Sequence, residues 1–386
     1  MANFDVIIVG GGAVGVSVAR TLVGEGVRGV ALLERAHLAA GFTSRAAGIV
    51  SALTWDPTDA RLVTRSAEIY RQVAADHPGR FRFLEGGMLT LVGDRAAAAA
   101  MDRRAAMLRE VGVRVERLHP EEAAARWPDL RLDGVVAAWF TPDDGHVYAY
   151  DYTTVVGEEI AARGVRIVRD TAAARVAIEG GRAAGVETAG GERLAADVVV
   201  AANGVWSRKL LRASGLDLPL KPYRTQVAVL EAPEAPRVPI LHDTSLEFYW
   251  IPDGRKIIFG DGTEERESDP DAFFDANDED FLLSVAERLP RRCAGGASAR
   301  LTGGWAGLCD ATPDRRPLLG PYGGVEGLHL AVGFNGFGVM RAPAVGEAVA
   351  RLVLGRPAGL DLATHLARRF SGFVDFPITQ GFSTVE

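Results

Sequence analysis

A glycine-rich turn that directly follows the first apolar run constrains the fold of this chain more than any other feature. The β-branched run at 5–9 leads into Gly10-Gly11-Gly12-Ala13-Val14-Gly15. Residues 16–23 then carry a helical pattern, and a second apolar run at 30–33 ends at Glu34. This order predicts a strand, a glycine turn, a helix and a second strand, which together form a dinucleotide-binding β-α-β unit.

Each glycine of the turn has its own purpose in such a unit. Gly10 permits the tight turn, Gly12 lets backbone N–H groups approach a pyrophosphate, and Gly15 lets the helix pack closely on the strand. The helix N-terminus adds partial positive charge facing the phosphates. Glu34 lies about 20 residues beyond the turn, where an acid binds the ribose hydroxyls. An acid there disfavours the 2′-phosphate of NADP and leaves FAD and NAD open.

Length and composition exclude several classes of protein. A chain of 386 residues is long enough for two or three domains at about 150 residues each. The net charge of −7 argues against binding to a nucleic-acid backbone, which requires a clustered basic surface. The charged fraction of 24% and hydrophobic fraction of 48% are typical of a globular protein.

The cysteines and the apolar runs exclude further possibilities. Cys293 and Cys309 are the only cysteines, and their spacing fits neither a CxxC pair nor a metal site. No apolar run reaches the ~18 residues of a membrane helix. The first strand begins within four residues of the N-terminus, so we expect no signal peptide and a cytoplasmic location.

Helical patterns dominate the first half of the chain. Asp94 is the expected N-cap of a helix that runs to about residue 110, and Asp151 is the expected N-cap of a helix that ends at Ala162. His146, in a turn at 143–146, is expected to be a loop histidine and not a catalytic base.

The predicted secondary-structure pattern changes twice in the second half of the sequence. Residues 197–201 form a short buried strand that ends in small residues, as expected for a central parallel strand whose carboxyl end contacts a ligand. From about Pro219 the chain becomes β-rich, which predicts a mostly antiparallel sheet. The strand, glycine loop and helix pattern of the N-terminal part then returns, with a strand at 328–332, a glycine-rich loop at 333–338 and a helix at 342–354.

The late loop and helix predict a second element that faces negative charge, because the loop leads to a helix N-terminus. The glycines of this loop follow the order GxxGxG, so a second dinucleotide is not predicted.

Five segments together resemble the D-amino-acid oxidase superfamily of FAD enzymes, in particular its glycine oxidase, monomeric sarcosine oxidase and related dehydrogenase branches. In chain order they are 10–34, 44–49, 202–207, 312–320 and 333–346. The resemblance covers nearly the whole chain in the right order, so it specifies the superfamily more closely than the substrate.

The resemblance implies an α/β fold, α+β overall, with a Rossmann-like FAD-binding domain and a discontinuous antiparallel-sheet substrate domain. The FAD-binding domain is expected to contain 1–85, 145–220 and 321–370. The substrate domain is expected to contain 86–144 and 221–320, and 371–386 forms a C-terminal tail whose Phe373, Phe376 and Phe382 can pack on the body or on a partner.

The resemblance also implies a set of cofactor-binding residues in the glycine turn, at the ribose, along the flavin and beneath its pyrimidine ring. They are Gly10, Gly12, Ala13, Val14, Gly15, Glu34, Arg35, Thr43, Ser44, Arg45, Ala46, Ala47, Gly48, Val176, Ala202, Gly204, Trp206, Gly307, Gly333, Asn335, Gly336, Phe337 and Gly338.

Several positions depart from the family pattern. The cysteine through which sarcosine oxidases attach flavin is replaced by Gly307, so we expect non-covalent FAD. Cys309 stands where glycine oxidase has its carboxylate-binding arginine. The sarcosine-type lysine falls on Met340 and the oxygen-activating lysine on Ile258.

Oxidation of an amino acid requires a clamp for the carboxylate, and arginine suits this role because its fork binds both oxygens. Arg341 is the first choice for the clamp, with Arg224 and Arg45 in reserve. Tyr249 matches the active-site tyrosine of the family and can donate a hydrogen bond to the carboxylate. The expected pocket residues are Trp250, Cys309, Phe337 and Arg224.

Three functions remain open at this point. The first is an oxidase of sarcosine, another N-alkylglycine, glycine or a proline-like imino acid that reduces O2 to H2O2. The second is a dehydrogenase of the same substrates that passes electrons to a quinone, a dye or a partner protein. The third is a flavin-binding subunit of a larger complex without its own catalysis. A simple NAD dehydrogenase leaves the 333–338 loop unexplained, and the oligomeric state is open.

Overall fold

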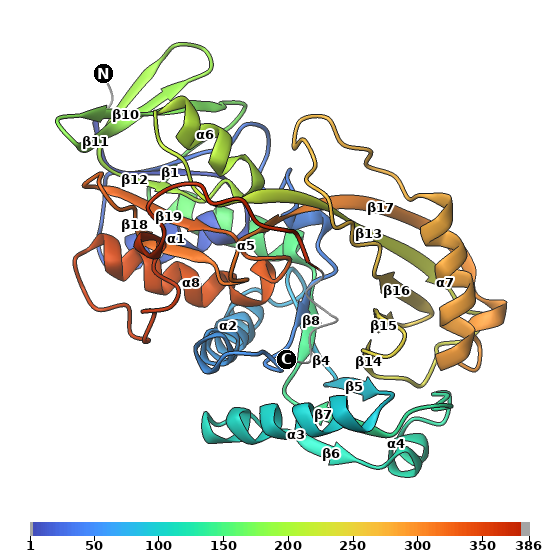
Figure 1. The fold of residues 1–386 in the computed structure, drawn as a ribbon. Coiled ribbons are helices and arrows are strands. Elements are labelled where there is room, and N and C mark those ends of the chain that lie inside the picture. The colour runs from blue at the N-terminus through green and yellow to red at the C-terminus, as the bar shows by residue number, and fades with distance from the viewer. Residues whose placement is uncertain (1–2, 380–386) are drawn as a thin grey trace.

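The computed structural model describes residues 3–379, which form two eight-stranded sheets and one three-stranded sheet (Figure 1). Phe382, in the expected tail, lies outside the described residues. The helices are α1 (Ala13–Gly24), α2 (Pro57–Asp76), α3 (Arg95–Glu110), α4 (Pro120–Arg126), α5 (Ala149–Ala162), α6 (Ser207–Ala213), α7 (Glu279–Arg292) and α8 (Gly338–Val353).

The first sheet carries the glycine turn. Its strands are β1 (Asn3–Val9), β2 (Val30–Leu33), β9 (Arg166–Val168), β10 (Ala173–Glu179), β11 (Arg182–Thr188), β12 (Arg193–Ala201), β18 (Leu318–Pro321) and β19 (Leu328–Val332). β1 pairs in parallel with β2 and β12, and the carboxyl half of β12 also pairs in parallel with β19. The carboxyl ends of these strands therefore meet at one edge of the sheet.

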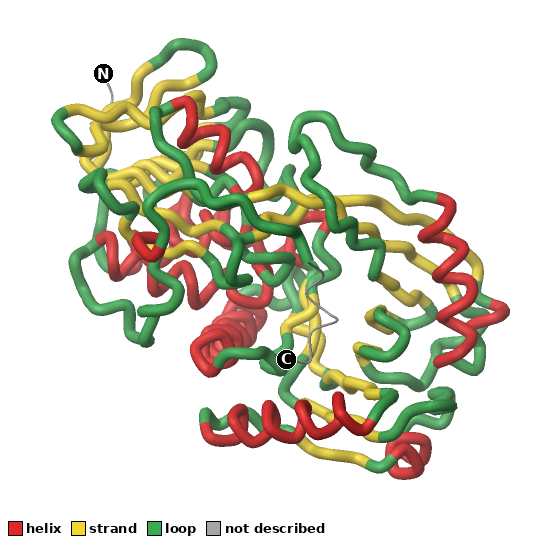
Figure 2. Tube along the Cα trace, viewed as in Figure 1, coloured by secondary structure: helices red, strands yellow, loops and turns green. Residues whose placement is uncertain are grey.

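Both faces of the first sheet are buried. Along β1, Val6 and Ile8 belong to the core beneath α1 and α8, whereas Ile7 and Val9 belong to a second core on the other face. This alternation follows from the two-residue period of a strand. Helices α1, α2, α5 and α8 cluster on one side of the sheet (Figures 1 and 2).

The second sheet runs in the order β17-β13-β16-β15-β14-β5-β7-β6. Its strands are β5 (Met88–Val92), β6 (Glu116–Leu118), β7 (Ala137–Thr141), β13 (Lys221–Glu231), β14 (Ile240–Asp243), β15 (Phe248–Asp253), β16 (Lys256–Gly260) and β17 (Arg300–Ala311). The small sheet joins β3 (Ile49–Val50), β4 (Phe83–Glu85) and β8 (Gly145–Val147). The second sheet thus combines two parts of the chain, 88–141 and 221–311, that are separated in sequence by strands β9 to β12 of the first sheet.

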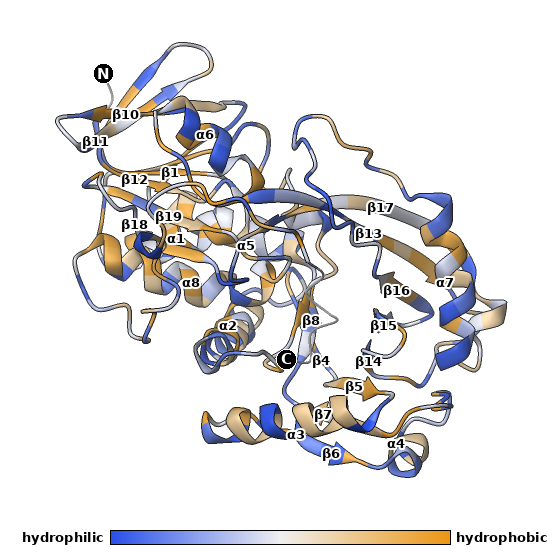
Figure 3. Cartoon of the chain, in the orientation of Figure 1, coloured by the Kyte–Doolittle hydropathy of each residue, from blue (hydrophilic) through white to orange (hydrophobic). Residues whose placement is uncertain are grey.

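Helix α7 covers one face of the second sheet. Its buried residues Phe281, Val285 and Leu289 pack in one core with Trp250 and Phe259. Hydrophobic and hydrophilic residues both appear along this helix, as its position at the surface requires (Figure 3). The other face of the sheet is left to line a cavity.

The structure confirms the expected fold class and corrects some details. Asp94 caps α3 as expected, because its Oδ1 accepts a hydrogen bond from Ala97 N at 2.8 Å. Tyr148, and not Asp151, is the N-cap of α5, and Asp151 lies in the first turn. His146 lies in strand β8 and not in a loop. β18 pairs with β19 in the first sheet, so this strand crosses the boundary expected at 320.

A buried ion pair fastens α7 to the second sheet. The Arg292 guanidinium donates to Asp243 Oδ2, and the two side chains are 3% and 0% exposed. Asp243 Oδ1 also accepts hydrogen bonds from the backbone of Ser245 at 2.9 Å and Leu246 at 3.0 Å.

We predict that Arg292→Met lowers the free energy of unfolding by about 3–5 kcal/mol, because Asp243 is then left as an unpaired buried charge. Urea unfolding followed by circular dichroism measures this change. Arg291→Gln is the matched control, since Arg291 is exposed on the same helix turn. Equal stability of the two variants would contradict the prediction.

Candidate functional site

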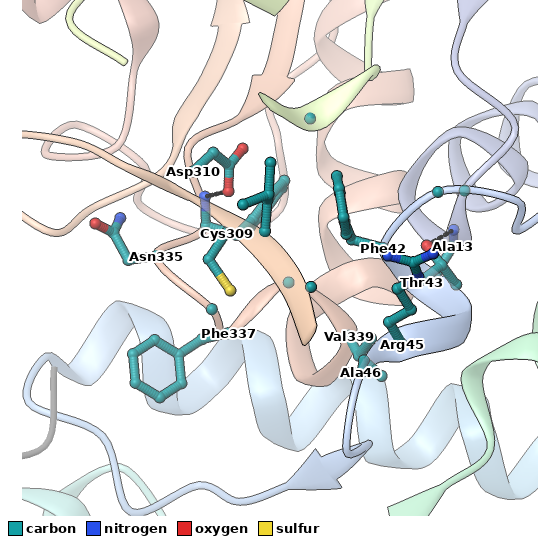
Figure 4. Close-up of a pocket in the computed structure, with 18 of the residues that line it drawn as sticks. Ala13, Phe42, Thr43, Arg45, Ala46, Cys309, Asp310, Asn335, Phe337 and Val339 are labelled. Carbon is teal, nitrogen blue, oxygen red and sulfur yellow. Dashed lines mark hydrogen bonds between the residues drawn. The ribbon is translucent and has the colours of Figure 1, made fainter. Parts of the chain in front are cut away.

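A cavity of about 560 Å³ is lined by residues of both large sheets. On the side of the first sheet it is lined by the glycine turn and the ends of β2 and β12. On the other side it is lined by β13, β14, β15 and β17 of the second sheet. Figure 4 shows Phe42, Thr43 and Arg45 facing the side of the cavity opposite Cys309 and Phe337.

Most residues that the sequence assigned to a cofactor line this cavity. They are Gly10, Gly12, Ala13, Val14, Glu34, Arg35, Thr43, Arg45, Ala46, Ala47, Gly48, Ala202, Gly204, Trp206, Gly307, Asn335, Gly336, Phe337 and Gly338. Segments more than 300 residues apart in sequence thus meet around one space.

The glycine turn leaves no room for side chains. Gly10 has φ +113°, and a Cβ there would lie 2.5 Å from the carbonyl oxygen of Ala202. A Cβ on Gly12 would lie 2.8 Å from Thr43 Oγ1. Gly12 is also the N-cap of α1 and provides no side-chain cap, and Ala13 N in the first turn donates to Thr43 Oγ1 at 3.2 Å, so the N-terminus of the helix lies at the cavity.

Glu34 is held in a fixed orientation beside the turn. Its Oε2 accepts a hydrogen bond from Gly11 N at 2.8 Å, and its Oε1 accepts one from Ala36 N at 3.0 Å. A carboxylate oxygen can accept more than one hydrogen bond, so Glu34 remains able to bind ribose hydroxyls.

The second glycine-rich loop is anchored by a buried acid. Asp310, on β17, accepts hydrogen bonds from Gly333 N at 2.6 Å and Phe334 N at 3.0 Å. Asn335 has φ +54° and donates from Nδ2 to the Gly333 carbonyl at 2.7 Å. Helix α8 begins at Gly338, directly after this loop, so its N-terminus lies at the cavity. Burial raises the pKa of Asp310 to about 6.

Two neutral polar groups, Tyr249 and Cys309, lie in the wall formed by the second sheet. The ring of Tyr249 lies across Gly260, where a Cβ would come within 2.2 Å of the tyrosine hydroxyl oxygen. Burial raises the pKa of Tyr249 and raises the pKa of the Cys309 thiol to about 12. Both groups are therefore protonated at neutral pH.

The structure corrects two arginine assignments. Arg341 is 1% exposed and forms an ion pair with Asp59, with 2.9 Å between Nε and Oδ1. Arg224 donates to Glu264 and, at 2.6 Å, to Asp278 Oδ2. Neither side chain lines the cavity. Both guanidiniums already have carboxylate partners, which removes the reason to expect a substrate carboxylate there.

The alternation of side chains along a strand explains a third correction. Trp250 points to the α7 face of the sheet, opposite its neighbour Tyr249, and its Nε1 donates to the Pro239 carbonyl at 2.9 Å. Other expected cofactor residues also lie outside the lining of the cavity. They are Gly15, Ser44, Val176 and Gly333. Gly15 and Gly333 act instead through the packing of α1 and the anchoring of the loop.

Among the ionisable cavity residues that sequence reasoning missed, besides Asp261 and Asp310, is Arg104 on α3. Its Cζ lies 5.5 Å from the ring centroid of Trp55. Burial lowers the pKa of Arg104 to about 10. A signal was present, because Arg104 follows the buried Met101 by three residues and precedes the buried Leu108 by four. An arginine on the buried face of a helix is desolvated at a cost in free energy, so its presence there indicates an interaction that offsets this cost.

Two other classes of site find no support in residues 3–379. No helix in this range has the length and apolarity required to cross a membrane. No cluster of acidic, histidine or cysteine side chains in this range has the geometry of a metal site.

We predict that Gly12→Val weakens FAD binding roughly tenfold or more, because the new side chain would fill the space before Thr43 and cover the N-terminus of α1. The ratio of flavin to protein absorbance after dialysis measures retention. Gly24→Ala is the control, since the nearest atom to its Cβ would be Arg163 Nη1 at 3.9 Å. Full retention by Gly12→Val would place the phosphates elsewhere.

We predict a pH effect from Asp310. Its pKa is about 6 in the folded protein and about 3.9 in the unfolded chain, so between these values the folded state keeps a proton that the unfolded state has lost. The free energy of unfolding therefore falls as pH rises from about 4 to about 6, by up to roughly 3 kcal/mol from this group.

Asp310→Asn should remove this part of the pH dependence. Urea unfolding of the FAD-free protein at pH 4.5 and 7 tests it, with Asp133→Asn, an exposed acid, as the control. The same pH dependence in Asp310→Asn and the unsubstituted protein would overturn the assignment.

Comparison with known proteins identifies similar chains. Glycine oxidase of Geobacillus kaustophilus is 27% identical over 383 residues, which cover 96% of this chain and 98% of that protein. The solved structure of L-proline dehydrogenase from P. horikoshii has a TM-score of 0.88 and 26% identity, and the match covers 96% of this chain and 99% of that chain. The fold is therefore shared along almost the full length of both structures.

Another relative is longer. 4-Methylaminobutanoate oxidase (formaldehyde-forming) of Paenarthrobacter nicotinovorans is 26% identical, and the match covers 95% of this chain but 45% of that protein. Mouse sarcosine dehydrogenase is likewise covered only to 41%. The chain thus spans less than half the length of these two relatives.

The family model described as DAO, FAD dependent oxidoreductase, matches residues 5–352. The structure fits this cofactor, because the glycine-rich turn, the N-termini of α1 and α8, and Glu34 all border one cavity. The cofactor is FAD, and the chain belongs to the DAO family of FAD-dependent oxidoreductases.

Proposed function

We propose that this enzyme oxidises a small amino acid or secondary amine at a C–H bond next to nitrogen. One observation carries the proposal: a single cavity connects the dinucleotide turn and Glu34 with Tyr249 and Cys309 on the second sheet. A substrate bound against that sheet therefore shares an enclosed space with the cofactor.

The names of the relatives support this class of substrate. Glycine oxidase, sarcosine dehydrogenase, 4-methylaminobutanoate oxidase and L-proline dehydrogenase are all named for an amino acid or an N-substituted amino acid. Two of these relatives are more than twice as long as the matching region, so the activity of the whole proteins supports this proposal only by analogy.

The reaction removes two electrons and two protons from the substrate amine and leaves an imine, which water hydrolyses. Bound FAD supplies the electron acceptor for the hydride that leaves the C–H bond. The N–H groups at the start of α8 would stabilise negative charge on the bound cofactor, and Asp310 holds their loop in place. The N-terminus of α1 would hold the pyrophosphate.

The sheet wall orients the substrate without taking its proton. Because the raised pKa of Tyr249 keeps its hydroxyl protonated, this group acts as a hydrogen-bond donor. Cys309 is a neutral thiol for the same reason, and Gly307 stands at the attachment position of the sarcosine oxidases. These features support FAD that is bound without a covalent link.

The electron acceptor divides the proposal into two forms. An oxidase passes electrons to O2 and forms H2O2. The position of the oxygen-activating lysine is Ile258, which packs in an apolar cluster with Val227, Ile240 and Ile251. The lack of a cation at that position favours the second form, a dehydrogenase that reduces another acceptor.

Anaerobic titration of the purified holoenzyme tests the proposal. We expect sarcosine, proline, glycine or a longer N-methylamino acid, at a nearly saturating concentration, to bleach the flavin absorbance band in a single turnover. Bleaching follows because the bound cofactor takes both electrons of the substrate. A flavin that no member of this panel reduces would contradict catalysis and support a non-catalytic flavin subunit.

Admission of air to the reduced enzyme then separates the two forms. Rapid recovery of the band with stoichiometric H2O2 identifies an oxidase, and slow recovery without peroxide identifies a dehydrogenase. A peroxidase-coupled dye assay measures the peroxide.

A further inference from the structure

We propose that Arg104 forms a binding site for the anionic group of the substrate, and that this site lies across the cavity from Cys309. The substrate is then an N-alkylamino acid whose carboxylate is separated from the reacting carbon by several bonds. This inference rests on the proposed function and specifies its substrate class.

The charge of Arg104 has no counter-ion within residues 3–379. Three arginines line the cavity. Arg35 has Asp271 at 3.5 Å and Arg45 has Asp275 at 3.5 Å, whereas no carboxylate of the described residues lies within 4.0 Å of the Arg104 guanidinium. Arg104 is therefore the arginine that is available to an anionic ligand.

The surroundings of Arg104 make an unpaired charge costly at this position. The side chain is half-buried, lies over Trp55 and is close enough to His242 to lower the pKa of that histidine. Burial lowers the pKa of Arg104 only to about 10, so the guanidinium is charged at neutral pH. An unpaired charge in a desolvated place is unfavourable, and a bound carboxylate would relieve that cost while gaining a two-pronged hydrogen bond.

His242 does not compete for the anion. Burial is the main cause that lowers its pKa, to about 4, so the imidazole is neutral at pH 7. Asp243, the next residue, acts in the opposite direction but does not reverse the shift. Arg104 thus provides the positive charge at this end of the cavity.

The topology places Arg104 far from the position where glycine oxidase has its clamp. Cys309 lies on β17, at one edge of the second sheet, whereas α3 packs beside β6 and β7 at the other edge (Figure 1). His242 lies on β14, four strands from β17. At about 4.8 Å between neighbouring strands, β14 and β17 are roughly 19 Å apart along the sheet.

Arg104 nevertheless remains within reach of the cofactor loop. The centroid of the Trp55 ring lies 5.2 Å from that of Phe337, the residue that precedes α8, and Arg104 Cζ lies 5.5 Å from the Trp55 centroid. In an α-amino acid the carboxylate is attached to the carbon that bears the nitrogen, so it cannot extend away from the reacting centre. A chain of several methylene groups lets the amine lie near the cofactor while the carboxylate reaches Arg104.

Flavin reduction by a matched substrate series tests the assignment. The series is sarcosine, 3-(methylamino)propanoate, 4-(methylamino)butanoate and, without a carboxylate, N-methylpropylamine. For the unsubstituted holoenzyme we expect half-saturation at a concentration roughly tenfold lower for the butanoate than for sarcosine or the amine, as one added ion pair provides.

Arg104→Gln should raise the half-saturating concentration of 4-(methylamino)butanoate roughly tenfold. The limiting rate with this substrate should stay unchanged, as should the half-saturating concentration and limiting rate of N-methylpropylamine. Arg104→Lys should recover part of the loss because it restores the charge without the fork. Arg103→Gln, on the exposed side of α3, is the matched control. Equal losses for butanoate and amine would show a structural role and overturn the proposal, as would sarcosine being the preferred substrate.

Binding of butanoate itself, without the methylamino group, separates this inference from the proposed function. It is measured on the oxidised holoenzyme by the flavin difference spectrum or by calorimetry. Saturable binding that Arg104→Gln weakens and Arg103→Gln does not would support the anion site even if no amine reduces the flavin. Equal binding by the unsubstituted enzyme, Arg104→Gln and Arg103→Gln would overturn the site even if turnover is observed.

Discussion

The close approach of three backbone segments at the carboxyl ends of β1 and β12 supports the rest of the site. A Cβ on Gly15 would lie 1.9 Å from the Gly10 carbonyl oxygen, and one on Gly10 would lie 2.5 Å from that of Ala202. Helix α1 therefore begins directly beside the end of β12, and its N-terminus borders the cavity, where Ala13 N donates to Thr43 Oγ1. A phosphate group is suited to that space because it brings the negative charge that the helix N-terminus favours.

The second sheet divides its residues between support and recognition. Along β15, Phe248 and Trp250 face α7 and form a core with it, while Tyr249 and Ile251 face the opposite side. The Arg292–Asp243 pair fastens the same helix to the sheet. The cavity wall is thus held from behind by packing, and Tyr249 faces the cavity.

The arginines show how tertiary structure assigns function among identical side chains. The sequence contains 43 basic residues, of which Lys209, Lys221 and Lys256 are the lysines, so arginines are numerous. Arg341 is paired with Asp59 and Arg224 with Glu264 and Asp278. Arg104 lines the cavity without such a partner in the described part of the chain. Of the three arginines that line the cavity, Arg35 and Arg45 each have an aspartate partner within the described residues, and this contrast is the basis for proposing Arg104 as the anion site.

The sequence by itself determined the FAD unit, because the glycine spacing, the helix that follows it and Glu34 are local features with a fixed geometry. It also determined the family, the fold class and the Gly333–Gly338 loop before a helix. Only the tertiary structure decided which arginine is available, which side of β15 faces the cavity, and that Asp310 anchors the loop. These depend on contacts between segments far apart in sequence, and the identity of a residue does not reveal whether its charge is already neutralised by a distant partner.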